Sequence, residues 1–191
     1  MTPPATHPAT IADDVLRLLE SVGVSYVFTC PGTTEVPLLI AAERRAGPQL
    51  VLTTHESAAV AMADGYARAT GELGVVLLHA NVGLCNGLAP LYAAQIAGTP
   101  LLVLNGIKAT ALHHRRAMTF TPESHRLAEP FCKRSLIPGS PGEALEDLSQ
   151  AIAEARQPPS GPVYVGLPQD PGGRQSRGEW ALSCGDTRSR M

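Results

Sequence analysis

The sequence QLVLTTHESAAVAMADGYARATG, residues 49–71, joins a strand to a helix and indicates the class of fold. Its first part, Gln49 to His55, is a short apolar, β-branched run that is typical of a buried strand. Its second part, Glu56 to Gly71, is rich in alanine, has apolar residues at helical spacing and ends at a glycine. A buried strand that leads directly into a helix predicts one unit of an α/β protein.

The same alternation continues on both sides of this segment. Further buried strands are predicted at residues 25–29, 74–79, 100–105 and 162–168, with an edge strand at 132–137. Further helices are predicted from Thr10 to Gly23, at 35–45, after the loop ANVGLCNG (80–87) as far as Gly98, and at 140–156. Strands this apolar are covered on both faces, so we predict a single-domain three-layer α/β/α fold with a mainly parallel central sheet.

Composition excludes several classes of protein. The chain has 191 residues, of which 17% are charged, and a formal net charge of -2 with no basic stripe, which argues against nucleic acid as a partner. No apolar run reaches membrane-spanning length, and the N-terminus has no signal-peptide pattern. The four cysteines are scattered and are expected to be reduced and structural, so we predict a cytoplasmic protein.

Three segments depart from the regular alternation. We expect residues 1–10 to be flexible, 11–170 to form the domain, and 171–191 to be a disordered tail. Residues 107–130 are long for a plain connection and suggest a segment that is mobile or ordered by a partner. Within it, His113, His114, Arg115 and Arg116 form a cationic run. Such a run binds an anion or an acidic partner, or is a solvated loop.

Three loops are predicted to gather at the carboxyl edge of the sheet, where α/β proteins bind ligands: CPGTTE (30–35), HES (55–57) and HANVGLCNG (79–87). Gly32 and Gly83 allow close approach of the backbone, but neither loop is a phosphate-binding motif. Glu56 lies at this edge, at a helix start. There a carboxylate either serves the ligand site or stabilises the first helical turn through the helix dipole.

These segments resemble the pyrimidine-binding (N-terminal) domain of thiamine diphosphate-dependent enzymes of the acetolactate synthase and benzoylformate decarboxylase group. The resemblance rests on VFTCPGTTEVPLL, THESAAVAMADGYARATG, LLHANVGLCNGLAPLYAAQIAGTPLLVLNG and GPVYVGLPQD, in the order and spacing of the family. It covers about residues 11–170. It implies a flavodoxin-like pyrimidine-binding domain and thiamine diphosphate as the cofactor.

The resemblance assigns roles around the cofactor. Glu56 corresponds to the glutamate that hydrogen-bonds the aminopyrimidine ring and stabilises its imino tautomer, which makes Glu56 a catalytic and cofactor-binding residue. Pro31 and Gly32 in the first loop, and Gly83 and Asn86 in the third, are expected to line the cofactor site. Asn86 also admits a simpler interpretation as a helix cap.

Two further residues resemble those of benzoylformate decarboxylase. His79 stands in an LH-x-x-x-G pattern, which implies a proton donor or acceptor near the substrate. Its alternative is a strand-end histidine bonded to a nearby carbonyl. Thr33 falls in the PG-x turn, where the resemblance implies a contact with the substrate carboxylate; its alternative is a turn hydroxyl that caps the next helix.

The sequence also lacks features of the complete enzymes in this family. The sequence has no GDG followed by an asparagine-rich stretch, the pattern that marks the diphosphate and magnesium domain, and its carboxylates and histidines show no ligand spacing. We therefore predict one subunit of a split 2-keto acid decarboxylase or carboligase, or a fragment of a larger one. The partner chain would supply the diphosphate domain and Mg²⁺, and we expect a homodimer alone and a two-plus-two heterotetramer with that partner. The alternative is a regulatory or interaction protein that retains the fold without catalysis.

Overall fold

The computed structural model describes residues 10–109, 112–114, 119, 121 and 123–169. Of the segment predicted to be flexible, 1–10, residues 1–9 lie outside these ranges, and so does the tail predicted to be disordered, 171–191. So do Arg115 and Arg116 of the cationic run.

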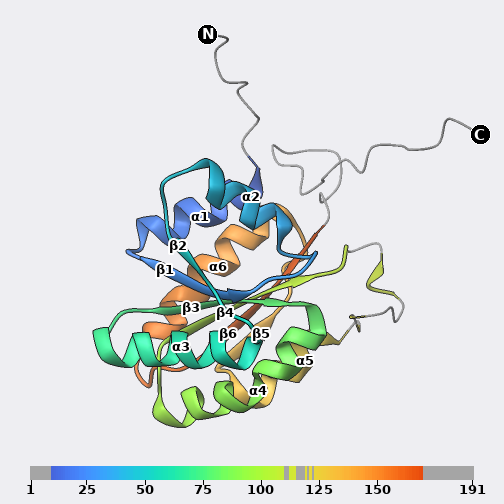
Figure 1. Ribbon diagram of the computed structural model, residues 1–191. Coiled ribbons are helices and arrows are strands. Elements are labelled where there is room, and N and C mark those ends of the chain that lie inside the picture. The colour runs from blue at the N-terminus through green and yellow to red at the C-terminus, as the bar shows by residue number, and fades with distance from the viewer. Residues whose placement is uncertain (1–9, 110–111, 115–118, 120, 122, 170–191) are drawn as a thin grey trace, which may run out of the picture.

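A six-stranded sheet forms the centre of the domain (Figure 1). Its strands are β1 (Tyr26–Cys30), β2 (Gln49–Leu52), β3 (Gly74–His79), β4 (Leu101–Ile107), β5 (Arg134–Leu136) and β6 (Val163–Pro168). They lie in the order β2-β1-β3-β4-β6-β5, and every neighbouring pair is parallel. The predicted parallel sheet is therefore confirmed. The segment predicted as an edge strand, 132–137, contains β5, which is an edge strand of the sheet.

Helices cover both faces of this sheet. They are α1 (Ile11–Ser21), α2 (Val36–Arg44), α3 (Glu56–Thr70), α4 (Ala80–Ala97), α5 (Ser124–Ala128) and α6 (Pro141–Arg156), with a 3₁₀ turn at Glu129–Phe131. Figure 1 shows α1, α2 and α6 on one side and α3, α4 and α5 on the other. The predicted three-layer α/β/α fold is confirmed.

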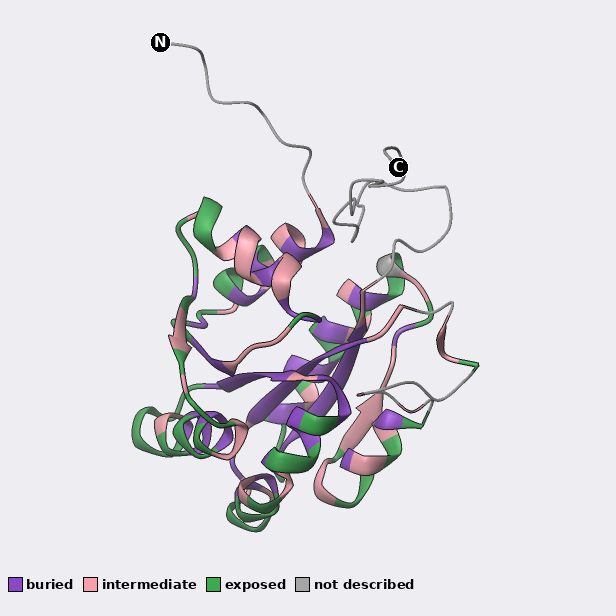
Figure 2. Cartoon of the chain, turned by 45° about the vertical axis from the view of Figure 1, so that its right-hand side comes forward, coloured by how far each residue is buried: buried purple, intermediate pink, exposed green. Residues whose placement is uncertain are grey.

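Alternate residues of the central strands enter two separate cores. In β3, Val75 and Leu77 pack into the core under α1, α2 and α6, whereas Val76 and Leu78 pack under α3 and α4. All four side chains are buried, and in Figure 2 the central strands are coloured as buried along most of their length. This two-sided burial explains why the strands are apolar at every position and do not alternate.

Two connections differ from the sequence prediction. The segment ANVGLCNG is not a loop but the first two turns of α4, which begins directly after β3. Its glycines serve packing, because a Cβ atom at Gly87 would lie 3.0 Å from Cγ2 of Val60 on α3. The second difference lies within residues 107–130, where α5 and the 3₁₀ turn form an element that the sequence did not indicate.

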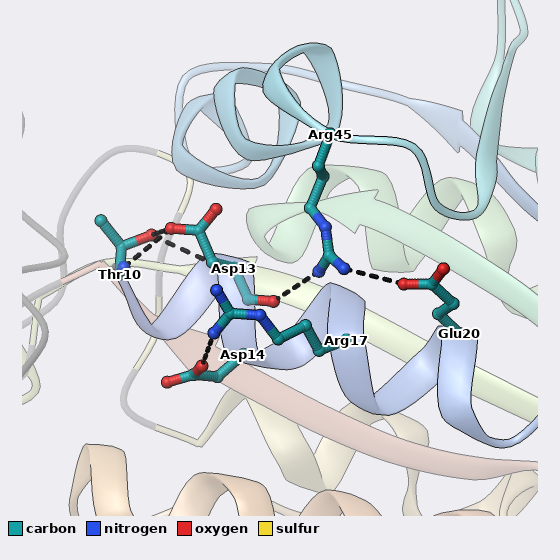
Figure 3. Close-up of polar contacts among 6 residues, drawn as sticks. All are labelled: Thr10, Asp13, Asp14, Arg17, Glu20 and Arg45. Atoms are coloured by element: carbon teal, nitrogen blue, oxygen red, sulfur yellow. Dashed lines mark hydrogen bonds and ion pairs between the residues drawn. The ribbon is translucent and has the colours of Figure 1, made fainter. Parts of the chain in front are cut away.

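Helix α1 fixes the position of α2 through polar contacts (Figure 3). Thr10 and Asp13 form a capping box: the Thr10 hydroxyl accepts from the Asp13 N–H at 3.3 Å, and the Asp13 carboxylate accepts from the Thr10 N–H at 2.7 Å. Arg45, just after α2, donates to the Asp13 carbonyl at 2.9 Å and to the Glu20 carboxylate at 2.7 Å. The end of α2 is thereby tied to α1.

None of the described helices is both long enough and apolar enough to cross a membrane.

We expect Thr10→Ala to lower the free energy of unfolding by about 1 kcal/mol, because it leaves the Asp13 N–H in the first turn of α1 without its side-chain acceptor. Urea unfolding followed by circular dichroism measures this loss. Arg17→Ala is the control, since its exposed ion pair with Asp14 should contribute less than about 0.5 kcal/mol. Equal losses in the two variants would show that the capping box does not stabilise α1.

Candidate active site

The candidate site lies where the chain reverses its direction across the sheet. From β1 the chain moves outward to β2, and it then returns to the other side of β1 as β3. Open α/β sheets bind ligands outside the carboxyl ends of their strands at such a reversal. Cys30 at the end of β1 pairs with Leu78 near the end of β3, so the loop after β1 faces the start of α4.

Glu56 is the first residue of α3, next to its N-cap residue His55. One carboxylate oxygen, Oε2, accepts a hydrogen bond from Asn86 Nδ2 at 2.9 Å. The Ser57 hydroxyl donates to the backbone carbonyl of Asn86, which fixes the same pair of helices a second time. The other carboxylate oxygen, Oε1, has no hydrogen-bond partner among the described residues. Asn86 is the seventh residue of α4, so its interpretation as a helix cap is wrong.

Gly83 lies against both Glu56 and His79. A Cβ atom added there would be 3.2 Å from Oε1 of Glu56 and 3.4 Å from Cβ of His79. The bare backbone of Gly83 therefore leaves room beside the free carboxylate oxygen. The fold brings Glu56, His79, Gly83 and Asn86 together, as their shared place at the sheet edge predicts.

His79 is held from its Nδ1 side by two neighbouring residues of the loop after β1. Its Nδ1 lies 2.7 Å from the Thr34 hydroxyl and 3.0 Å from Oε2 of Glu35. Neither partner is a backbone carbonyl, which the simpler interpretation of His79 required. Nε2 has no hydrogen-bond partner among the described residues, and the side chain is 18% exposed.

Glu35 is a carboxylate with no exposed surface. It accepts hydrogen bonds from the Gly32 N–H at 2.7 Å and from the Thr34 hydroxyl, in addition to its contact with His79. Burial raises the pKa of Glu35 above its usual 4.5, while these three partners pull it partly back. A buried carboxyl with a raised pKa, in contact with a histidine, is the kind of group that occurs at functional sites.

Two glycines make room for this cluster. A Cβ atom at Gly32 would lie 2.6 Å from the His79 ring, and one at Gly106 would lie 2.1 Å from Oε1 of Glu35. Gly32 therefore leaves room for the His79 ring, and its contact with the cofactor stays a prediction. Pro31 precedes it and is half-buried.

Thr33 lies apart from the cluster, with an exposed side chain. Its backbone carbonyl accepts a hydrogen bond from Gln169 at 2.8 Å. The residue in the N-cap position of α2 is Glu35, which makes no side-chain cap. The alternative interpretation of Thr33 as the cap of this helix is therefore wrong, and its predicted contact with a substrate stays a prediction.

Sequence reasoning missed Glu35, Thr34 and Gly106. Glu35 was assigned only to the start of a helix, although an acid just before the apolar run VPLLIAA is a sequence signal in itself. Gly106 is the penultimate residue of β4, where a glycine marks close approach of another group. Their meeting with His79 depends on three different strands and could not be read from spacing.

The other titratable groups have simpler surroundings. Burial, with the negative charges of Glu56 and Glu35, raises the pKa of Cys30, which keeps this thiol protonated. Cys30, Cys85 and Cys132 are free, as predicted, while Cys184 lies outside the described residues. The Nε2–H of His113 donates a hydrogen bond to the Lys108 carbonyl at 2.7 Å, and His114 is exposed. No group of three or more potential metal ligands occurs within the described residues.

Known proteins are similar to this chain in sequence and in fold. The family described as thiamine pyrophosphate enzyme, N-terminal TPP binding domain, matches residues 9–126. The 2-hydroxyacyl-CoA lyase 2 of Mus musculus is 37% identical over 158 residues, which are 83% of this chain and 25% of the relative. Benzoylformate decarboxylase of Pseudomonas aeruginosa is 34% identical over 161 residues, which are 84% and 30%.

A solved structure gives the same result. The thiamine diphosphate-dependent 4-hydroxybenzoylformate decarboxylase of Rhodococcus jostii RHA1 superposes with a TM-score of 0.80 at 33% identity. The superposition covers 84% of this chain and 30% of that one. The chain thus spans between a quarter and a third of the length of these relatives.

The sheet of this α/β domain reverses its strand order beside Glu56 at the start of α3, the place where open α/β sheets bind ligands. The chain belongs to the thiamine pyrophosphate enzyme family, as its N-terminal, TPP-binding domain. Its cofactor is thiamine diphosphate.

The raised pKa of Glu35 predicts a pH-dependent stability. The folded state binds the Glu35 proton more tightly than the unfolded state, so this residue makes the free energy of unfolding fall as pH rises above 4.5. Glu35→Gln cannot ionise. Relative to wild type, its free energy of unfolding should therefore increase from pH 4.5 to neutral pH, as measured by urea unfolding at a series of pH values.

Glu146→Gln is the matched control, because Glu146 is exposed on α6. Its stability should run parallel to that of wild type at every pH. If Glu35→Gln also runs parallel, the Glu35 carboxyl is not perturbed by burial and the argument for a shared proton fails.

Proposed function

We propose that this chain is the pyrimidine-binding subunit of a thiamine diphosphate-dependent enzyme that acts on a 2-keto acid as a decarboxylase or carboligase. Residues 11–170 would form its one domain. A partner chain would hold the diphosphate and Mg²⁺. The chain alone would be incomplete as an enzyme.

The observation that carries this proposal is the state of the Glu56 carboxylate. Asn86 anchors Oε2, so the carboxylate has a fixed direction, and Oε1 is left beside the bare backbone of Gly83. An anchored carboxylate with one free oxygen, and with no side chain at Gly83 to cover it, fits a ring nitrogen that carries a proton. Glu56 also stands at the start of α3, where the positive end of the helix dipole lies.

Thiamine diphosphate, when bound, supplies a nucleophilic carbon that attacks a carbonyl group. The part of this chain is to hold the aminopyrimidine ring. Glu56 Oε1 would accept the hydrogen bond of the protonated ring nitrogen and stabilise the tautomer in which the exocyclic nitrogen acts as a base. Pro31, Gly32 and Gly83 would form the wall along the ring, with Asn86 behind Glu56.

The substrate would lie on the side of His79. Glu35 and Thr34 occupy Nδ1 of this ring, so Nε2 is the atom that would give a proton to the substrate or take one from it. The buried Glu35 carboxyl would set the tautomer of the ring, as a positioning residue. Thr33 would direct its hydroxyl to the substrate carboxylate.

The surface of α4 supports a partner chain next to Glu56. The eighteen residues of α4 include no charged side chain, although one face of the helix is exposed. That face consists of Val82, Cys85, Asn86, Ala89, Tyr92, Ala93 and Ile96. Tyr92 is 53% exposed and Ile96 is 70% exposed. An exposed helix face without charges, with large hydrophobic side chains in contact with water, supports the proposal that another protein surface covers it.

This uncharged face includes Asn86, which contacts Glu56, and exposed uncharged residues of α3, Ala58, Ala61 and Met62, extend it. A protein packed here would lie directly beside the cofactor ring. We therefore assign the face to the diphosphate-binding subunit, in a two-plus-two complex, with a homodimer of this chain when alone. A cytoplasmic location stays a prediction.

Glu56→Gln tests the function. The variant keeps the size and hydrogen bonding of the side chain but removes the charge that favours the required tautomer. In the reconstituted complex it should assemble normally and lose on the order of 100-fold in turnover. Proton exchange at the reactive carbon of the bound cofactor, followed by NMR in deuterated water, should slow in parallel.

His79→Ala is the matched variant on the substrate side. It should lose turnover with nearly unchanged proton exchange, because it acts on the substrate and not on the ring. Exchange at the wild-type rate in Glu56→Gln would refute the assignment of Glu56 and favour the alternative, an interaction protein without catalysis.

The uncharged face predicts a second outcome. A charge at Tyr92→Glu or Ile96→Glu should abolish the complex with the diphosphate-binding subunit and leave the fold intact, as judged by light scattering and circular dichroism. Ala153→Glu, on the exposed side of α6, should assemble as wild type. Normal assembly of both α4 variants would move the interface elsewhere.

The lone chain should bind thiamine diphosphate only weakly in a calorimetric titration.

A further inference from the structure

The junction between β3 and α4 holds an unusual buried asparagine. Asn81, the second residue of α4, is only 7% exposed. Its side chain pairs twice with Thr121: Nδ2 donates to the threonine hydroxyl at 3.1 Å, and Oδ1 accepts from the threonine N–H at 3.3 Å. Its own N–H donates to the Thr119 carbonyl at 3.0 Å. Three hydrogen bonds thus join residues that are about forty positions apart.

The backbone bond serves the start of the helix. The first N–H groups of any helix lack partners within it, and the N-cap residue His79 makes no side-chain cap here. The Thr119 carbonyl therefore supplies an acceptor that a capping side chain would normally provide. Asn81 joins the start of α4 to Thr119 and Thr121 in place of a local cap.

The same contact coincides with backbone strain. Ala80 has φ 46° and Thr119 has φ 68°, and they are the non-glycine residues with positive φ in the described chain. Ala80 directly precedes Asn81, and Thr119 carries the carbonyl that Asn81 binds. A left-handed conformation without glycine persists only where surrounding contacts impose it. The three bonds of Asn81 are the contacts that impose it at Ala80.

The residue before this strained turn is His79. Its ring is held on the opposite side by Glu35 and Thr34. The direction of the chain at Ala80 therefore decides whether Nδ1 of His79 reaches these two partners. Ring and backbone are fixed from two independent loops that meet at the end of β3.

We propose that Asn81 is a positioning residue for His79. By pairing with Thr119 and Thr121 it fixes the turn at Ala80, and so holds the His79 ring with Nδ1 on Glu35 and Nε2 toward the substrate. This inference rests on the proposed function for the role of Nε2, while the positioning itself is a property of the chain alone.

The test is the tautomer of His79, read from its ring nitrogen shifts in NMR spectra of the histidine-labelled full chain. The signal is assigned by its loss in His79→Gln. Asn81→Ala should relax the turn, weaken the bond from Nδ1, and shift the ratio of the two tautomers about fivefold, as the loss of one hydrogen bond does. Thr121→Val removes only the hydroxyl acceptor and should shift the ratio in the same direction by less. Thr121→Ser should restore it.

Thr99→Val is the matched control at the other end of α4. It breaks a similarly buried threonine hydrogen bond, from the Thr99 hydroxyl to Asp64 at 2.6 Å, and should leave the His79 tautomer unchanged while lowering stability. If Asn81→Ala does not fold, Thr121→Val and Thr121→Ser decide the question. A wild-type ratio in the folded Asn81 or Thr121 variants would overturn the proposal.

The measurement needs neither cofactor nor turnover, so it separates this inference from the proposed function. A shifted tautomer together with full activity of His79→Ala in the complex would retain the positioning and refute the role of His79. An unchanged tautomer would refute the positioning whatever the activity of the complex.

Discussion

The burial of the Glu35 carboxyl is the constraint on which the candidate site depends. A carboxyl without exposed surface must find hydrogen-bond donors inside the protein, and each of its donors comes from a residue at the carboxyl edge of the sheet. Satisfying it draws the loop after β1 onto the end of β3 and requires Gly106 on β4 to lack a side chain. This requirement holds the His79 ring from one side, because Nδ1 of His79 is one of the partners.

The close packing of α3 on α4 sets the second half of the site. Gly87 lets α4 approach Val60 of α3, and the same approach brings Asn86 within 2.9 Å of the Glu56 carboxylate. The glycines of the segment ANVGLCNG, which was predicted to be a loop, therefore allow α3 and α4 to pack closely. Glu56 and His79 both lie against Gly83 in the first turns of α4. The cofactor side and the substrate side of the proposed site therefore meet at this residue.

The two halves of the site differ in their exposure to solvent. The Glu35 cluster is buried and is stabilised within the chain, whereas the face that adjoins Glu56 is uncharged and exposed along α4. An uncharged helix face in contact with water is stabilised when another protein surface covers it, and in the proposed function the place of this face beside Glu56 would link assembly to cofactor binding.

By itself the sequence determined the layered α/β fold, the strand-to-helix order and the place of Glu56, because apolar strands, helical spacing and terminal glycines are local signals. It also placed His79, Gly83 and Asn86 at one edge, since parallel strands end together. Only the tertiary structure decided that Glu35 is buried against His79, that Asn86 holds Glu56, and that Asn81 reaches Thr121. Those contacts join residues roughly thirty to forty-five positions apart, and their partners are chosen by how strands and helices pack, which no local pattern encodes.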